Sequence, residues 1–75
     1  MKPTPIVALN RAVAAGKAFG PEVGLTELKD LPNSAKLIGY PFYPAAQGEF
    51  NLLAGRSAEA AKHFERARQL AQSLP

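Results

Sequence analysis

Two stretches of the sequence share one pattern of residue sizes: GLTELKDL at residues 24–31 and AAKHFERA at residues 60–67. In each, a small residue stands one helical turn before a large one, and a further apolar residue follows three positions later. The matched pairs are Gly24 with Ala60, Leu28 with Phe64 and Leu31 with Ala67, all at an offset of 36 positions. This pattern is typical of the second helix in a helical-hairpin repeat. It therefore predicts stacked helical hairpins, an architecture that more often binds other molecules than catalyses reactions.

Prolines and glycines mark the ends of four expected helices. Thr4 and Pro5 are a favourable N-cap and first helical residue, and Gly20 ends the helix that they open. Pro residues likewise fit only the start of the second and third helices, because later helical positions need their N–H groups. Ser57 is expected to cap the fourth helix. We thus expect an all-α fold of four helices in one domain over residues 1–75, with a hairpin at about 5–31, a connection at 32–40 and a hairpin at about 41–74.

Apolar residues at helical spacing predict the core. We expect burial of Leu25, Leu28 and Leu31 in the first hairpin, of Leu37 and Ile38 under the connection, and of Ala46, Phe50, Leu53, Ala60, Phe64, Ala67, Ala71 and Leu74 in the second hairpin. Gly24 lies mid-helix, where glycine costs about 1 kcal/mol relative to alanine. We therefore expect the first helix to approach closely there, so that Gly24→Ala is tolerated and Gly24→Leu disrupts the hairpin.

The composition is that of a small globular chain. There are 75 residues with 47% hydrophobic content and no Cys, so neither disulfides nor a thiolate metal site can stabilise it. No apolar run approaches the roughly 20 residues that span a bilayer, and the N-terminus has no signal-peptide pattern. These features predict a cytoplasmic protein without membrane association. The net charge of +3 is compatible with weak nucleic-acid contact and equally with ordinary solubility.

No pattern for catalysis, metal or cofactor binding is present in the sequence. His63 is the only histidine and has no partner ligands at metal-binding spacing. The hydroxyl residues fit roles as caps, loop residues or packing residues, and the glycines form no phosphate-binding loop. We therefore expect no enzymatic activity, no metal and no cofactor.

Several segments along the chain together carry a resemblance to a known protein family. They are IVALNRAVA at residues 6–14, GPEVGL at 20–25, GYPFYPAA at 39–46 and GEF at 48–50, followed by Gly55-Arg56, Glu59-Ala60 and His63-Phe64. They resemble the C-terminal region of bacterial extracytoplasmic-function (ECF) RNA polymerase sigma factors that carry a tetratricopeptide (TPR) extension. The resemblance implies a TPR-like fold that works through protein contact. The domains with which sigma factors read promoter DNA have no counterpart in this chain.

The resemblance also implies a partner groove. In TPR repeats the first helix of each hairpin lines a concave groove, where an Asn commonly holds a partner's backbone. The register of this sequence then gives the candidate groove residues as Asn10, Val13, Lys17, Phe42, Glu49 and Leu52. Arg11 is an alternative structural ion-pair residue. The aromatic cluster of Tyr40, Phe42 and Tyr43 either covers the joint between the hairpins or anchors a partner.

The predicted function is protein–protein interaction. By the resemblance, the partner is the sigma core domains, RNA polymerase or a regulator, with a role in transcription initiation in the parent protein. Alternatives are a stand-alone TPR-like adaptor unrelated to transcription and a weak nucleic-acid binder. Specific DNA binding is not expected, because acidic residues interrupt the basic residues of the last helix. Apolar end faces of two repeats make a dimer plausible.

Overall fold

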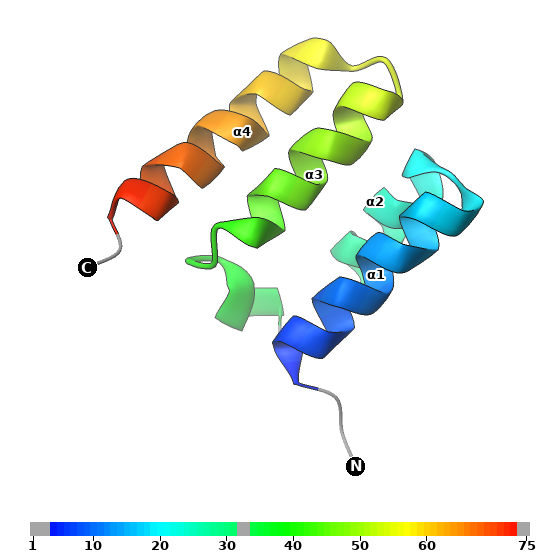
Figure 1. Cartoon of the computed structure of the whole chain (residues 1–75), viewed down its shortest axis with the longest axis horizontal. Coiled ribbons are helices and arrows are strands. Elements are labelled where there is room, and N and C mark those ends of the chain that lie inside the picture. Colours follow the sequence, from blue (N-terminus) through cyan, green and yellow to red (C-terminus); the bar gives the residue numbers. More distant parts are fainter. Residues whose placement is uncertain (1–3, 32–33, 74–75) are drawn as a thin grey trace.

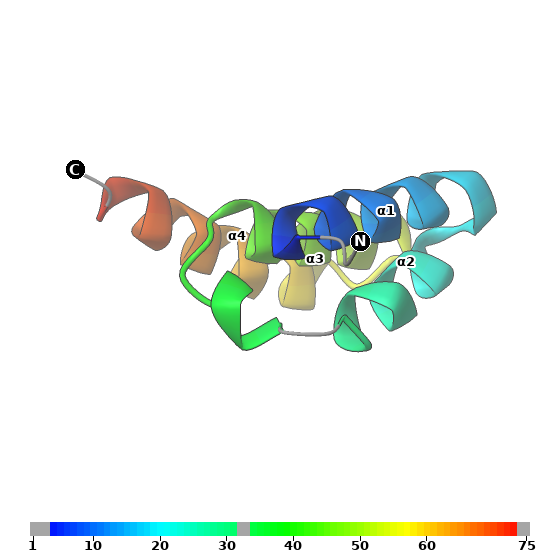
Figure 2. The ribbon, with the colours of Figure 1, turned by 90° about the horizontal axis from the view of Figure 1, so that it is seen from below.

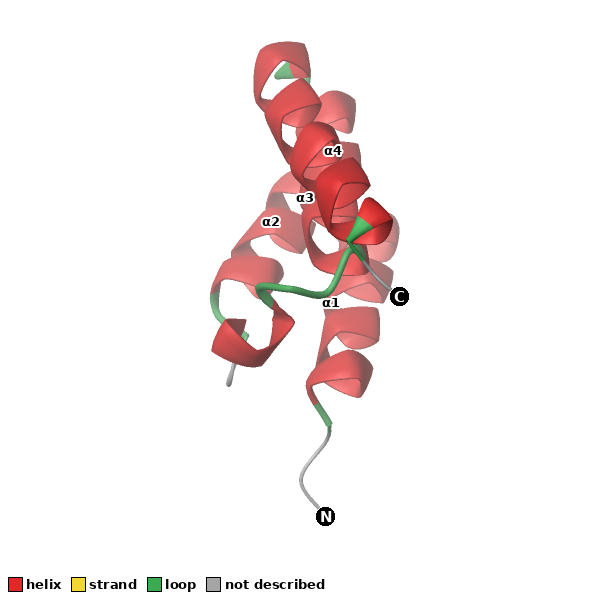
Figure 3. Cartoon of the chain, turned by 90° about the vertical axis from the view of Figure 1, so that its left-hand side faces the viewer, coloured by secondary structure: helices red, strands yellow, loops and turns green. Residues whose placement is uncertain are grey.

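The computed structural model describes residues 4–31 and 34–73. Those residues contain four α-helices and one short 3-10 helix, and no strand is found among them (Figure 3). The elements are α1 (Pro5–Phe19), α2 (Pro21–Lys29), η1 (Ser34–Leu37), α3 (Phe42–Leu53) and α4 (Ser57–Gln72). The predicted all-α fold with four α-helices is confirmed.

The four α-helices form two antiparallel hairpins, α1 with α2 and α3 with α4 (Figure 1). Helices α1 and α3 lie side by side and run in the same direction (Figure 1). In Figure 2, α2 and η1 lie below α1 and α3, on the other face of the molecule. Helix α3 contacts both α1 and α2, so it joins the second hairpin to the first. The result is a thin slab with extents of 38 × 35 × 15 Å.

Local signals account for most helix ends. The Thr4 hydroxyl accepts a hydrogen bond from the Val7 N–H at 3.1 Å, as expected for an N-cap. Gly20 ends α1 at φ +116°, a conformation that side chains disfavour, and its N–H donates to the Gly16 carbonyl. Ser57 is not a cap as predicted, because α4 begins at that residue and Arg56 occupies the cap position without a side-chain capping bond.

Other boundaries differ slightly from the prediction. Helix α2 ends at Lys29 with Asp30 as its C-cap, two residues before the predicted Leu31. The expected connection contains η1, a turn that the sequence pattern did not predict. The predicted end signal at Pro32 and the predicted core residue Leu74 lie outside the described residues.

Phe50 is the centre of the core. Its side chain is 0% exposed and lies where α3 meets the first hairpin, packed with Leu9, Ala12, Leu28, Leu37 and Ala46. Two glycines leave the space for its ring. A Cβ added to Gly24 would lie 2.6 Å from Phe50 Cε2, and one added to Gly16 would lie 2.6 Å from Phe50 Cε1 and 2.8 Å from the Gly24 Cα. The contact of Gly16 with Gly24 confirms the predicted close approach of α1, but the side chain that occupies the space at Gly24 is Phe50 of α3, which the sequence did not predict. We call Gly16 and Gly24 the glycine notch.

Parts of the predicted core are wrong. Ile38 is 55% exposed because η1 turns Leu37, rather than Ile38, into the core. Leu53, the last residue of α3, is 64% exposed, although it follows buried Phe50 by three residues. Ala71 is exposed near the end of α4, and Ala67 is half-buried.

Phe64 differs from its repeat partner Leu28. A Cβ on Gly48 would lie 2.7 Å from the Phe64 ring, so this ring packs directly on the α3 backbone. The ring is nonetheless 40% exposed, whereas Leu28 is 1% exposed. The difference arises because α3 covers the first hairpin, while no described helix covers α4 in the same way.

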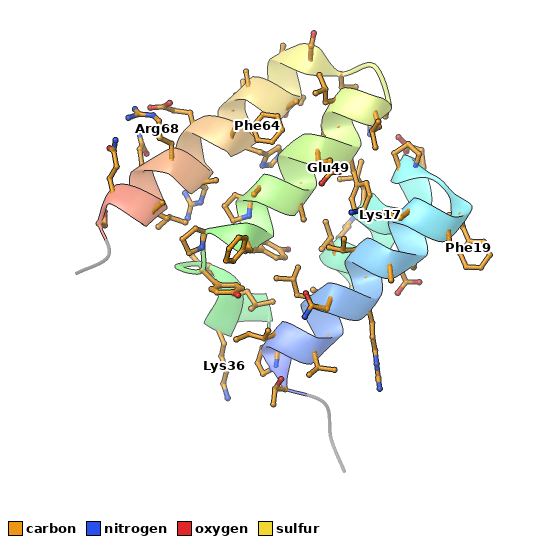
Figure 4. The ribbon with its side chains drawn as sticks, in the orientation of Figure 1. Lys17, Phe19, Lys36, Glu49, Phe64 and Arg68 are labelled. Atoms are coloured by element: carbon orange, nitrogen blue, oxygen red, sulfur yellow. The ribbon has the colours of Figure 1, made fainter. Side chains whose placement is uncertain are left out.

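We expect Phe64→Ala to lower the free energy of unfolding by about 2 kcal/mol, less than the roughly 3–5 kcal/mol typical of a fully buried aromatic residue. Urea denaturation followed by circular dichroism measures the effect. The matched control is Phe19→Ala, because Phe19 is 76% exposed and points away from the slab (Figure 4). Surface changes of that kind stay within about 0.5 kcal/mol. Equal midpoints for the two variants would contradict the packing of Phe64 on Gly48.

Candidate functional site

A pocket of about 350 Å³ opens between α1 and α3. Its size is at the small end of the range for ligand pockets, roughly 300–1,000 Å³. The lining residues are Leu9, Asn10 and Val13 from α1, Tyr40 from the segment before α3, and Phe42, Ala45, Ala46 and Glu49 from α3.

Helical spacing explains how these side chains come together. On α3, Phe42, Ala45 or Ala46, and Glu49 recur every three or four residues, so they share one side of the helix. On α1, Leu9 and Val13 are related in the same way, and α1 runs alongside α3 (Figure 1). The pocket is therefore the place where one side of each parallel helix meets the other.

The pocket has an apolar floor and a mixed rim. Leu9 and Ala46 are buried and belong to the core. Asn10, Phe42 and Glu49 are exposed at the rim, and Phe42 is 66% exposed. An amide, an aromatic ring and a carboxylate are thus presented around an apolar recess.

The aromatic cluster divides into two roles. The Tyr43 hydroxyl donates a hydrogen bond to the Leu28 carbonyl at 3.2 Å, which ties the start of α3 to the end of α2. Tyr40 and Tyr43 are both partly buried against the core, which agrees with the joint-covering interpretation. Phe42 instead meets the Tyr40 ring edge-on, with centroids 5.3 Å apart at 64°, and remains exposed at the pocket.

The structure brings four of the six predicted groove residues to this pocket: Asn10, Val13, Phe42 and Glu49. Lys17 and Leu52 do not line it, although both are exposed and lie about one turn further along α1 and α3. Figure 4 shows Lys17 and Glu49 projecting from facing helices toward the seam between them. We call the strip formed by the pocket, Lys17 and Leu52 the α1/α3 groove.

Four lining residues were not predicted as groove residues: Leu9, Tyr40, Ala45 and Ala46. Leu9 and Ala46 carry the same helical periodicity as core residues, and they are in fact both core and pocket floor. Periodicity alone does not distinguish a buried side chain under a pocket from one under another helix.

A chain of polar contacts that the sequence did not predict connects the turn between α3 and α4 to the start of α2. Buried Asn51 donates through Nδ2 to the Gln47 carbonyl at 2.8 Å and accepts at Oδ1 from Arg56 Nε at 3.0 Å. Arg56 Nη2 then pairs with Glu22 Oε1 at 2.6 Å. Because both ends of this ion pair are largely exposed, the pair itself contributes only about 0–1 kcal/mol. Its effect is to hold the α3–α4 turn beside the start of α2.

The outer face of α4 is a set of local ion pairs. Glu59 pairs with Lys62 at 3.2 Å, and Glu65 pairs with Arg68. The Arg68 hydrogen bond holds the pKa of Glu65 below its ordinary value, and Glu65 raises the pKa of Arg68 in return. This pattern is that of a solvated helix face. Arg11 takes part in none of the ion pairs found among the described residues.

Other searches of residues 4–31 and 34–73 add two findings. No group of three or more His, Cys, Asp or Glu residues there is arranged to hold a metal ion. None of the described helices combines the length and the apolar character needed to cross a membrane.

A relative is found among known proteins. The chain is 41% identical over 71 residues to an uncharacterized protein of Rhizobium meliloti (strain 1021). The match covers 95% of this chain and 16% of that protein, so the chain spans about one sixth of the relative's length. No protein-family model and no solved structure matches the chain.

Proposed function

We propose that this chain is a protein–protein interaction module that binds its partner in the α1/α3 groove. The observation that carries the proposal is the open pocket between two parallel helices with Phe42, 66% exposed, at its rim. Aromatic residues are enriched at interface cores, and a large apolar ring left in water favours a role in contact. Asn10 beside it supplies an amide that can donate to and accept from a partner's backbone.

The paired hairpins, their parallel first helices and the 36-position repeat support a TPR-like interpretation. The resemblance to the C-terminal region of ECF sigma factors makes the sigma core domains, RNA polymerase or a regulator of either our proposed partners, in the cytoplasm. Docking there would control the availability of the sigma core. A similar stretch forms 16% of the Rhizobium meliloti protein, which supports a role as one part of a larger protein.

A stand-alone adaptor is the second form of the same proposal. Genomic context separates the two, because sigma core domains encoded in the same polypeptide would favour the sigma-linked role. Specific DNA binding is not part of the proposal. The cations of α4 alternate with carboxylates, and Lys62 and Arg68 are already paired.

We expect the double variant Asn10→Ala, Phe42→Ala to weaken capture of purified sigma core domains or RNA polymerase by at least about tenfold, the loss expected when interface anchor residues are truncated. Titration by fluorescence anisotropy at physiological salt measures it. Phe19→Ala is the matched control, because it removes an exposed aromatic ring that does not line the pocket.

Parallel titration with labelled promoter DNA tests the alternative class of partner. A contact driven by phosphates loses affinity linearly in the logarithm of salt concentration, with a slope near −0.9 for each phosphate on duplex DNA. Sub-micromolar, sequence-dependent DNA binding without protein binding would overturn the proposal in favour of a nucleic-acid binder.

A further inference from the structure

The charge of the pocket lining indicates which charge a bound partner should carry. Seven of its eight lining residues are uncharged, and Glu49 is the single charged one. The Glu49 carboxylate takes part in none of the ion pairs found among the described residues. The chain as a whole carries +3, so the one charge in the pocket lining is opposite in sign to the net charge.

The other end of the pocket is apolar. The edge-on pair of Tyr40 and Phe42 lies at this end, and Val13 and Ala45 add further apolar lining to the pocket. Such a recess accepts one large apolar side chain. Phe42 precedes Glu49 by seven positions, or about 10 Å along the helix axis at a rise of about 1.5 Å per residue.

From this arrangement we propose that the α1/α3 groove binds a peptide segment with a large apolar side chain in the pocket and a basic residue against Glu49. The inference rests on the proposed function and specifies its partner. In a helical partner lying along α3, the two residues are seven positions apart, the same separation as Phe42 and Glu49.

Lys17 would favour a partner with an acidic residue instead of a basic one. It points toward the same seam from α1 and belongs to none of the ion pairs among the described residues (Figure 4). An acidic partner would use Lys17 and avoid Glu49. The lining favours the basic partner, because Glu49 borders the pocket and Lys17 does not.

The test uses three alanine-based helical peptides and the full chain. The first carries one leucine and, seven residues later, one arginine; the second replaces the arginine by glutamate; the third replaces the leucine by alanine. Amide shifts in two-dimensional NMR report where each peptide binds and how tightly. The protein variants are Glu49→Gln, Lys17→Gln and, as a matched control, Glu27→Gln, an exposed carboxylate on α2 that lies outside the pocket lining.

We expect the leucine–arginine peptide to shift the amides of Asn10 and Ala45 and to bind tighter than the other two. Glu49→Gln should weaken it about two- to fivefold, as for an exposed ion pair, and added salt should have the same effect. Glu27→Gln should leave its affinity unchanged, and Lys17→Gln should leave it unchanged or tighter.

Tighter binding of the glutamate peptide, lost in Lys17→Gln, would overturn the basic partner while leaving the groove as a docking site. Absence of any shift at the pocket with all three peptides would also overturn the inference. The capture experiment with sigma core domains or RNA polymerase would then judge the proposed function separately.

Discussion

Phe50→Ala is expected to unfold the chain or bring it close to unfolding. The Phe50 ring projects from α3, is fully buried and packs against Gly16 of α1 and Gly24 of α2. Its removal therefore leaves a cavity between the two hairpins. Truncation of buried aromatic residues costs about 3–5 kcal/mol. Small domains have a total stability of about 5–15 kcal/mol, and a chain of 75 residues is at the lower end of that range.

Circular dichroism with urea denaturation measures the outcome. Phe50→Leu is the second variant, because leucine keeps part of the volume and should fold with a lowered midpoint even if the alanine variant does not. Phe19→Ala again provides an exposed-ring control. A midpoint of Phe50→Ala equal to that of the unmodified chain would mean that this ring does not join the hairpins.

The second large effect is expected at Gly24. The sequence predicts that Gly24→Ala is tolerated, because alanine is a better helix former by about 1 kcal/mol. The structure predicts instead that alanine destabilises the fold, since its Cβ would lie 2.6 Å from Phe50 Cε2 and 2.8 Å from Phe50 Cδ2. Overpacking of this kind costs about 1–3 kcal/mol, which exceeds the gain in helix propensity. Gly24→Leu should prevent folding of the first hairpin.

Thermal melting of Gly24→Ala and Gly24→Leu checks this expectation. The matched control is Gly39→Ala, because a Cβ at Gly39 meets nothing within 4 Å and that glycine does not have a positive φ. A double variant, Gly24→Ala with Phe50→Leu, should lose less stability than the two single changes added together, because they share one contact. Native-like melting of Gly24→Leu would exclude the glycine notch.

The helix ends were predictable because they depend on local chemistry. Thr4, Pro5, Gly20 and Pro21 set the boundaries of α1 and α2 through caps, fixed φ angles and positive φ, all of which act within a few residues. The wrong predictions concern burial, that is, which residues on one side of a helix are covered by other helices. Leu53 has the right spacing from Phe50 to be buried, but spacing does not reveal which residues on a helix side the neighbouring helices cover.

The candidate groove was predictable in part for the same reason. Asn10, Val13, Phe42 and Glu49 follow from helical periodicity on two helices and from the repeat offset. Lys17 and Leu52 share those helix sides but lie beyond the hollow between the helices, whose length depends on packing rather than on spacing. Asn51 was not predicted as a buried residue, because its partner Arg56 is also paired with Glu22, which is distant in the sequence.

The glycine notch also links the two hairpins during opening of the native state. A first hairpin without α3 would expose the backbone of Gly16 and Gly24 to water, with no side chain of its own to fill the gap. The three helices that meet at Phe50 are therefore one cooperative unit, and their amide protons become accessible to solvent exchange together. Helix α4, which packs on α3 through the half-exposed Phe64, lies outside this unit, so we expect its amide protons to exchange separately from those of the unit.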